Sequence, residues 1–181
     1  MADKALYVLA GYDDPTERIL SGLQRSLYEQ GFSGTQTRNI PMHITLGSFA
    51  ADQEEAAKKA LKRAAEQCAP FAVTCSHVGL FGGTDANVLF IAPDASREML
   101  ALKEFFGISA GWTAHTTLLI DRPEAIARAV PAVMRAFFPL SGTVTALYLY
   151  EFWPARLILS VPLTGPRRSA EKEGKTAFVS R

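Results

Sequence analysis

The sequence has few of the residues that mark a disulfide-stabilised or metal-bound protein. It contains two cysteines, Cys68 and Cys75, and three histidines among 181 residues. Two cysteines without metal-type spacing are more often buried apolar residues than a disulfide or a zinc site. The fold therefore has to be held together by its apolar core.

Excess charge and long apolar runs are also lacking. The formal net charge is +1, from 19 basic and 18 acidic residues, which argues against an extended nucleic-acid surface because phosphates are bound by many cations. The apolar run over 5–10 is too short for a signal sequence or a membrane span. We therefore expect a cytoplasmic, monomeric protein with no membrane partner.

The chain does contain regular alternation of apolar segments and turn formers. Hydrophobic residues make up 48% of the sequence and charged residues 20%, as in an ordinary globular protein. Apolar and alternating runs predict strands, and capping residues followed by apolar stripes predict helices. The predicted strands are 5–11, 42–49, 71–81, 87–92, 114–120, 142–153 and 155–163, and the predicted helices are 14–31, 52–67, 94–106 and 122–138.

A short motif occurs twice, each time on a predicted buried strand. The first copy is the His-Ile-Thr-Leu that begins at His43, and the second is the His-Thr-Thr-Leu that begins at His115. Side chains alternate along a strand, so residues i and i+2 share a face, about 6.5 Å apart. Thr45 should therefore lie beside His43, and Thr117 beside His115.

The elements around the two copies also repeat. Each copy is preceded by a strand, a helix and a loop and followed by a helix and a strand, and the two histidines are 72 residues apart. This order predicts an internal duplication with halves of about 4–83 and 86–163. We expect one bilobal domain over 1–165 with the site on the symmetry axis, and a loose tail over 166–181.

The simplest alternative is that these histidines are hydrogen-bonded core residues. That reading suits His77, which has glycine rather than threonine two positions later and no counterpart in the other half. For His43 and His115 it would require two polar pairs on buried strands, and each polar group buried without a partner costs about 1–3 kcal/mol. A functional cleft explains both pairs more easily.

Two histidines and two threonines suit in-line transfer at phosphorus. Histidine titrates near neutral pH, so one imidazole can accept a proton while the other donates one. Threonine hydroxyls can donate hydrogen bonds to the non-bridging phosphate oxygens as charge builds on them. This chemistry needs no metal or other cofactor.

The pair of tetrapeptides and the duplicated order resemble the two-histidine (2H) phosphoesterase superfamily, which includes 2′-5′ RNA ligase-like proteins and cyclic phosphodiesterases. The resemblance covers about residues 4–163. It implies an α+β fold with two antiparallel sheets that line a central cleft and helices on the outer faces. It also implies that His43 and His115 are the catalytic pair and that Thr45 and Thr117 hold the phosphate. Thr116 is polar where the family commonly has an apolar residue, and it should point away from the cleft.

The resemblance and the near-neutral charge predict a metal-independent phosphodiesterase that hydrolyses a 2′,3′-cyclic phosphate or a similar nucleotide or RNA-end diester. Phe81 is a candidate for stacking a nucleobase at the cleft rim, or else for turn packing, and Trp153 at the corresponding turn has the same two readings. Three alternatives remain: 2′-5′ RNA ligation, nucleotide or phosphate binding without turnover, and a zinc site formed by His43, His77 and His115.

Overall fold

The computed structural model describes residues 4–34, 36–107 and 111–166, and most of the predicted tail lies outside these ranges. Within these ranges the chain forms seven strands, four helices and one 3₁₀ turn, Ala51–Gln53, which confirms the predicted α+β class. The strands are β1 Ala5–Tyr12, β2 His43–Ala50, β3 Phe71–Phe81, β4 Asn87–Pro93, β5 Thr116–Asp121, β6 Leu140–Phe152 and β7 Arg156–Pro162. The helices are α1 Asp14–Glu29, α2 Glu54–Gln67, α3 Arg97–Glu104 and α4 Pro123–Ala136.

All seven strands belong to one antiparallel, hydrogen-bonded sheet, so the expectation of two separate sheets was wrong. The order is β2-β1-β6-β3-β4-β5, and β7 also pairs with β6. The reason is the length of β6, which has 13 residues. Its first residues pair with β3, as Leu140 does with Cys75, and its later residues pair with β1, as Phe152 does with Ala5. One strand thus runs through both lobes.

Each lobe is completed by a strand from the other half of the sequence. The first motif strand β2 pairs with β1, whose other neighbour is β6. The second motif strand β5 pairs with β4, whose other neighbour is β3. The element order β-α-β-α-β occurs twice along the chain, as the sequence predicts, but the third strand of each repeat is exchanged between the lobes.

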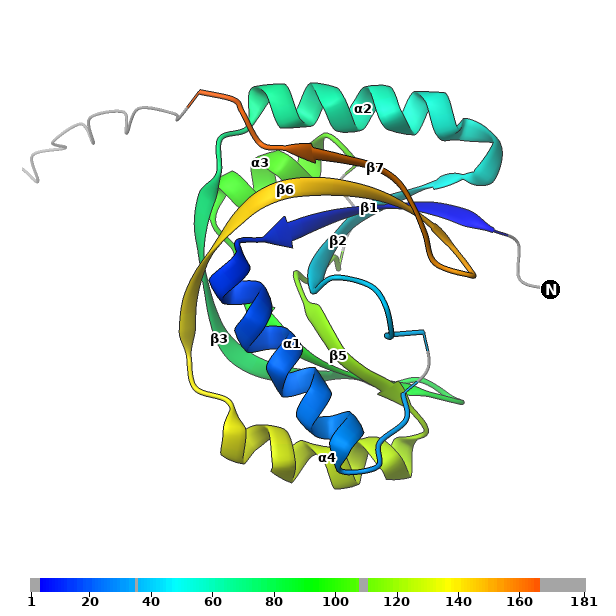
Figure 1. Ribbon diagram of the computed structural model, residues 1–181, viewed down its shortest axis with the longest axis vertical. Helices are drawn as coiled ribbons and strands as arrows, with labels where there is room; N and C mark the ends of the chain where they lie inside the picture. The colour runs from blue at the N-terminus through cyan, green and yellow to red at the C-terminus, as the bar shows by residue number, and fades with distance from the viewer. Residues whose placement is uncertain (1–3, 35, 108–110, 167–181) are drawn as a thin grey trace, which may run out of the picture.

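The helices lie on the side of the sheet that carries the main apolar core (Figure 1). Helix α2 packs against β1, β2, β6 and β7, while α1 packs against α4 and β5. Helix α1 begins after Asp13, whose carboxylate accepts a hydrogen bond from the Thr16 amide in the manner of an N-cap. No helix in the described part of the chain is long and apolar enough to span a membrane.

The opposite face of the sheet carries the motif residues. Residues opposite each other on paired strands share a face, and Gly11 lies opposite His43 while Leu9 lies opposite Thr45. Leu9 is fully buried yet lies outside the main core cluster, whereas its neighbours Leu6 and Val8 belong to that cluster. The His43 side of the sheet is therefore a second surface, separate from the helix-covered core.

Candidate active site

The two motif histidines are held in the same way. His43 is the first residue of β2, and its Nδ1 lies 2.7 Å from the carbonyl oxygen of Pro41. His115 immediately precedes β5, and its Nδ1 lies 2.8 Å from the carbonyl oxygen of Thr113. A carbonyl oxygen can only accept, so Nδ1 carries the proton in both rings and Nε2 is left for chemistry.

Strands β2 and β5 lie at opposite ends of the strand order, yet contacts from other elements bring them together. The indole Nε1 of Trp112, just before β5, donates to the carbonyl oxygen of Thr45 at 3.1 Å. From α1, the amide Nε2 of Gln24 donates to the carbonyl oxygen of Leu118 at 3.1 Å. The sheet therefore curves until its edges face one another, and each edge presents a histidine.

A cavity of about 630 Å³ opens between these edges. This volume is within the range of about 300–1,000 Å³ that is typical of small-molecule sites. Three of the four motif residues, His43, Thr45 and Thr117, line it, and so do Gln24 and Lys4. The other lining residues are Ala5, Tyr7, Gln36, Thr37, Ile40, Pro41, Met42, Ile120, Phe152 and Trp153.

His115 lies beside this cavity rather than in its wall. It is half-buried, and its ring packs edge-on against Phe81 with 4.8 Å between the centroids, while the centroid of Phe90 is 5.3 Å away. Strand β5, which begins at the next residue, nevertheless contacts β2, and Thr117 on it lines the cavity. The structure thus brings all four predicted motif residues to one region.

His43 is half-buried, like His115, and desolvation sets its protonation state. Desolvation lowers its pKa to about 4; the bond to the Pro41 carbonyl opposes this shift, and the charge of His115 adds to it. The strand is anchored nearby by Glu17, whose two carboxylate oxygens accept from the Met42 amide at 3.1 and 3.0 Å. His43 is consequently neutral at pH 7, with a free Nε2 lone pair.

Thr116 points into the core, as the strand alternation predicts. It is fully buried, and its hydroxyl lies 2.6 Å from the hydroxyl of Tyr12 at the end of β1. Burial raises the pKa of Tyr12, so this phenol stays protonated. The hydrogen bond gives both buried hydroxyls a partner.

Sequence reasoning did not identify Tyr12, Gln24 or Trp112 as supports of the site. Each of them bonds to a residue about 70 to 100 positions away in the chain. A single sequence has no periodicity that signals such pairs. Only the curvature of the sheet makes them neighbours.

The third histidine lies in a different cluster. His77, on β3, has its Nδ1 2.6 Å from the Ser76 hydroxyl and 3.4 Å from a carboxylate oxygen of Asp94, and its side chain is 72% exposed. Among the described residues, no three His, Cys, Asp or Glu side chains come together in a metal-binding arrangement. The described chain thus gives no support to a zinc site that combines His77 with the two motif histidines.

Known structures share this fold. The protein TT0787 of Thermus thermophilus has a TM-score of 0.63 and 17% identity, covering 90% of this chain and 100% of its own. LigT of E. coli in the apo form has a TM-score of 0.58 and 18% identity, and LigT complexed with 3′-AMP has a TM-score of 0.60 and 17% identity. Both LigT structures cover 89% of this chain and 98% of their own. Among curated proteins, no sequence matches this chain significantly.

The family is established by sequence. The pattern that describes the 2′-5′ RNA ligase superfamily matches residues 12–152, which include both His-x-Thr motifs and the long strand β6 that joins the lobes. The resemblance to 2H phosphoesterases is thereby confirmed. The chain belongs to the 2′-5′ RNA ligase superfamily of 2H phosphoesterases.

Proposed function

We propose that the protein is a phosphodiesterase that hydrolyses a 2′,3′-cyclic phosphate or a similar nucleotide or RNA-end diester, with His43 and His115 as base and acid. The observation that carries this proposal is the pairing of two imidazoles with the same Nδ1 bond beside a cavity lined by Thr45 and Thr117. Superfamily membership supports the reaction class.

The different environments of His43 and His115 favour His43 as the base. Desolvation keeps it neutral, which is the form that can accept a proton. Its Nε2 takes a proton from water while the water oxygen bonds to phosphorus. His115, protonated on both nitrogens, gives its Nε2 proton to the leaving 2′ or 3′ oxygen as the bond from that oxygen to phosphorus breaks. The products are a phosphate monoester and a free hydroxyl, and the proton count balances.

The threonines support this reaction electrostatically. Thr45 and Thr117 come from the two facing edge strands and line the same cavity as His43. Their hydroxyls can donate to the two non-bridging oxygens, on which negative charge increases as water adds. Because these donors are fixed on strands, little reorganisation is needed during the reaction.

The test is an assay of the purified protein with 2′,3′-cyclic adenosine monophosphate in excess EDTA. We expect turnover to a single monophosphate, resolved as the 2′ or 3′ isomer by chromatography. A parallel reaction contains an RNA with a 2′,3′-cyclic phosphate end and an RNA with a 5′-hydroxyl end. A longer RNA product would show that the protein is a ligase instead. If neither reaction gave a product, the result would favour a protein that binds nucleotide or phosphate without turnover. A cytoplasmic location and a monomeric state remain predictions from the sequence.

A further inference from the structure

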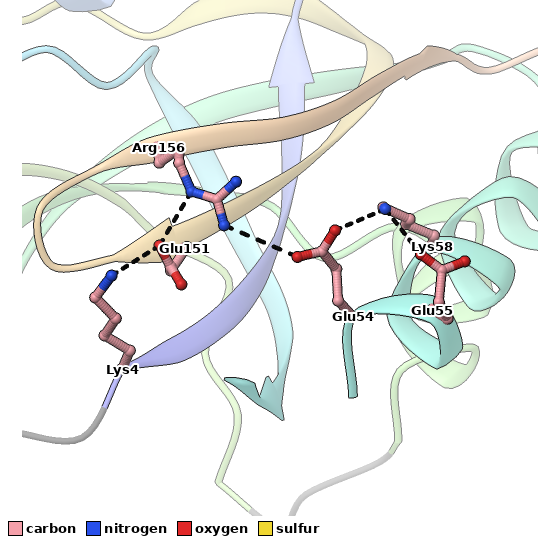
Figure 2. A network of polar contacts seen from close by, with 6 residues as sticks. All are labelled: Lys4, Glu54, Glu55, Lys58, Glu151 and Arg156. Carbon is pink, nitrogen blue, oxygen red and sulfur yellow. Dashed lines mark hydrogen bonds and ion pairs between the residues drawn. The ribbon is translucent and has the colours of Figure 1, made fainter. Parts of the chain in front are cut away.

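One buried charged residue is not used by the proposed reaction. Lys103, in the last turn of α3, is 6% exposed, and within the described ranges it is the only charged residue among the buried ones. Figure 2 shows a more usual arrangement, in which Lys58 forms ion pairs with Glu54 and Glu55 at 2.6 and 2.9 Å. No carboxylate in the described part of the chain pairs with Lys103. Burying a charge without a partner of opposite sign is costly, so this placement needs a reason.

The ammonium group of Lys103 contacts both ends of the connection between α3 and β5. Its Nζ donates to the carbonyl oxygen of Gly107, just after α3, in a part-buried hydrogen bond. The same Nζ lies 5.6 Å from the centroid of the Trp112 ring, within the distance of about 6 Å at which an aromatic face attracts a cation. Desolvation lowers the pKa of Lys103, as expected for an ammonium group without a carboxylate beside it. A carbonyl dipole and an aromatic ring thus take the place of an ion pair.

Trp112 connects this cation to both motifs. Its indole Nε1 donates to the carbonyl oxygen of Thr45 on β2 at 3.1 Å. The next residue, Thr113, provides the carbonyl oxygen that lies 2.8 Å from Nδ1 of His115. The position of Trp112 therefore affects the spacing between Thr45, which lines the cavity, and the histidine of the second motif.

The turn that ends α3 also packs closely against β2. A Cβ atom at Gly47 would lie 2.9 Å from the Cβ of Phe106 and 3.0 Å from its carbonyl oxygen, so a larger residue there would push the turn away from the strand. Gly47 is two residues after Thr45 on the same strand. The backbone from which Lys103 extends is therefore held close to the first motif.

A simpler explanation is that Lys103 only caps α3. Cations near the C-terminus of a helix are stabilised by the helix dipole and by the free carbonyl groups there, and Lys103 is the basic residue of the last turn. An exposed lysine could make that contact equally well. Capping therefore does not account for the burial of this side chain against Trp112, which is the contact that leads to the motifs.

We propose that Lys103 is a positioning residue for the proposed reaction, which acts through Trp112 on the spacing between the two motifs. This inference rests on the proposed function, because the spacing matters only if both motifs act on one phosphate. Lys103 contacts neither motif directly and does not line the cavity. Its effect is therefore on the geometry of the reacting groups rather than on substrate binding.

The first test compares kcat and KM for a 2′,3′-cyclic nucleotide. Lys103→Met keeps a long unbranched side chain and removes its cation. We expect kcat to fall about 10- to 100-fold, since a displacement of about 1 Å can cost about 100-fold, and KM to change little. Lys103→Arg retains a cation and should recover most of the loss. Lys58→Met removes the same charge from the ion pairs of Figure 2 and should keep wild-type activity.

The second test follows the contact through Trp112 without using turnover. The Nε1 proton of Trp112 should exchange with solvent slowly in the wild type, because it is bonded to Thr45, and several-fold faster in Lys103→Met. NMR measures this exchange, and Trp153→Phe assigns the other indole. Trp112→Phe removes the indole donor and should itself lower kcat. Adding Lys103→Met to it should then lower kcat little further.

The outcomes separate this inference from the proposed function. A wild type that turns over no cyclic phosphate, but whose Trp112 proton exchanges faster in Lys103→Met, overturns the phosphodiesterase and supports the contact from Lys103 to Trp112. Wild-type kcat or unchanged exchange in folded Lys103→Met overturns the inference alone, and so do losses in kcat that multiply in the double variant. If circular dichroism shows that Lys103→Met does not fold, Trp112→Phe decides, because wild-type kcat in that variant also overturns the inference.

Discussion

The His43 and His115 sides of the site have the same backbone pattern and different surroundings. Each histidine precedes a threonine by two positions, and each Nδ1 bonds to the carbonyl oxygen two residues earlier, at 2.7 and 2.8 Å. Yet His43 lines a cavity together with Tyr7 and Trp153, whereas His115 lies against Phe81. The repeated motif fixes where the imidazoles point, and the side chains around them differ.

This difference suggests that the two related halves have different roles in proton transfer. Desolvation keeps the His43 imidazole neutral, which suits the group that accepts a proton from water. The cavity lies on the same side, since Tyr7, Phe152 and Trp153 line it together with His43. The following predictions test whether the two halves really differ.

The largest expected effect is that of removing either imidazole. In His43→Ala and His115→Ala, kcat/KM for a 2′,3′-cyclic nucleotide should fall by about 10²–10⁴-fold, because each variant lacks one proton-transfer group. The double variant should be little worse than the single ones, since the two groups act in one step. Steady-state kinetics in EDTA measures all three.

His77→Ala is the matched control, because it removes the exposed third histidine and should keep wild-type activity. Wild-type activity in either motif variant would contradict the acid–base pair. A far larger loss in one than in the other would show that the halves are not equal partners in the rate-limiting step.

The next effect is that of the two threonines. Thr45→Val and Thr117→Val keep the shape of the side chain and remove its hydroxyl donor. Loss of one donor to a developing oxyanion typically costs about 10²-fold in kcat. We expect kcat to fall in both variants with little change in KM. Changes confined to KM would mean that these hydroxyls bind the ground state only, and circular dichroism checks that each variant is folded.

A smaller effect, on stability, concerns the one position at which the motifs differ. Ile44 is apolar, whereas Thr116 bonds to the Tyr12 hydroxyl in the core at 2.6 Å. Thr116→Val removes this hydrogen bond while the Tyr12 phenol keeps its contact with Cys75, which should lower the free energy of unfolding by about 0.5–1.5 kcal/mol. Adding Tyr12→Phe removes the other hydroxyl of this pair, and it should cost less in the Thr116→Val background than in the wild type. Urea unfolding measures this cycle, and strictly additive losses would contradict the pairing.

The sequence predicts the local parts of this site well. Alternation along a strand is a local property, so the common face of His43 and Thr45 and the inward direction of Thr116 could be anticipated. The sequence could not predict that all strands form one sheet, because this depends on the pairing of the long strand β6 with both β3 and β1. For the same reason Phe81 and Trp153 have the same two possible roles when they are judged from the sequence. The structure distinguishes them, because Trp153 lines the cavity and Phe81 does not.

A further prediction concerns the pH dependence of stability that follows from the lowered pKa of His43. Its pKa of about 4 lies below the ordinary value of 6.5, so between these pH values the unfolded chain binds more protons than the folded one. The stability of the protein should therefore fall as pH decreases from 6.5 towards 4. His43→Gln should make this dependence shallower, as measured by urea unfolding at several pH values.

The electrostatic coupling between His43 and His115 can be measured from the pKa of His43. The charge of His115 is the smallest of the three influences on the pKa of His43, after desolvation and the Pro41 carbonyl. His115→Gln removes that charge and should raise the pKa of His43 slightly, while desolvation keeps it below 6.5. Ring resonances followed by NMR, with His77→Ala to assign the third histidine, give the value directly. An unchanged pKa would mean that the imidazoles are too far apart to act on one phosphate, whereas a rise to 6.5 would mean that His115, rather than burial, keeps His43 neutral.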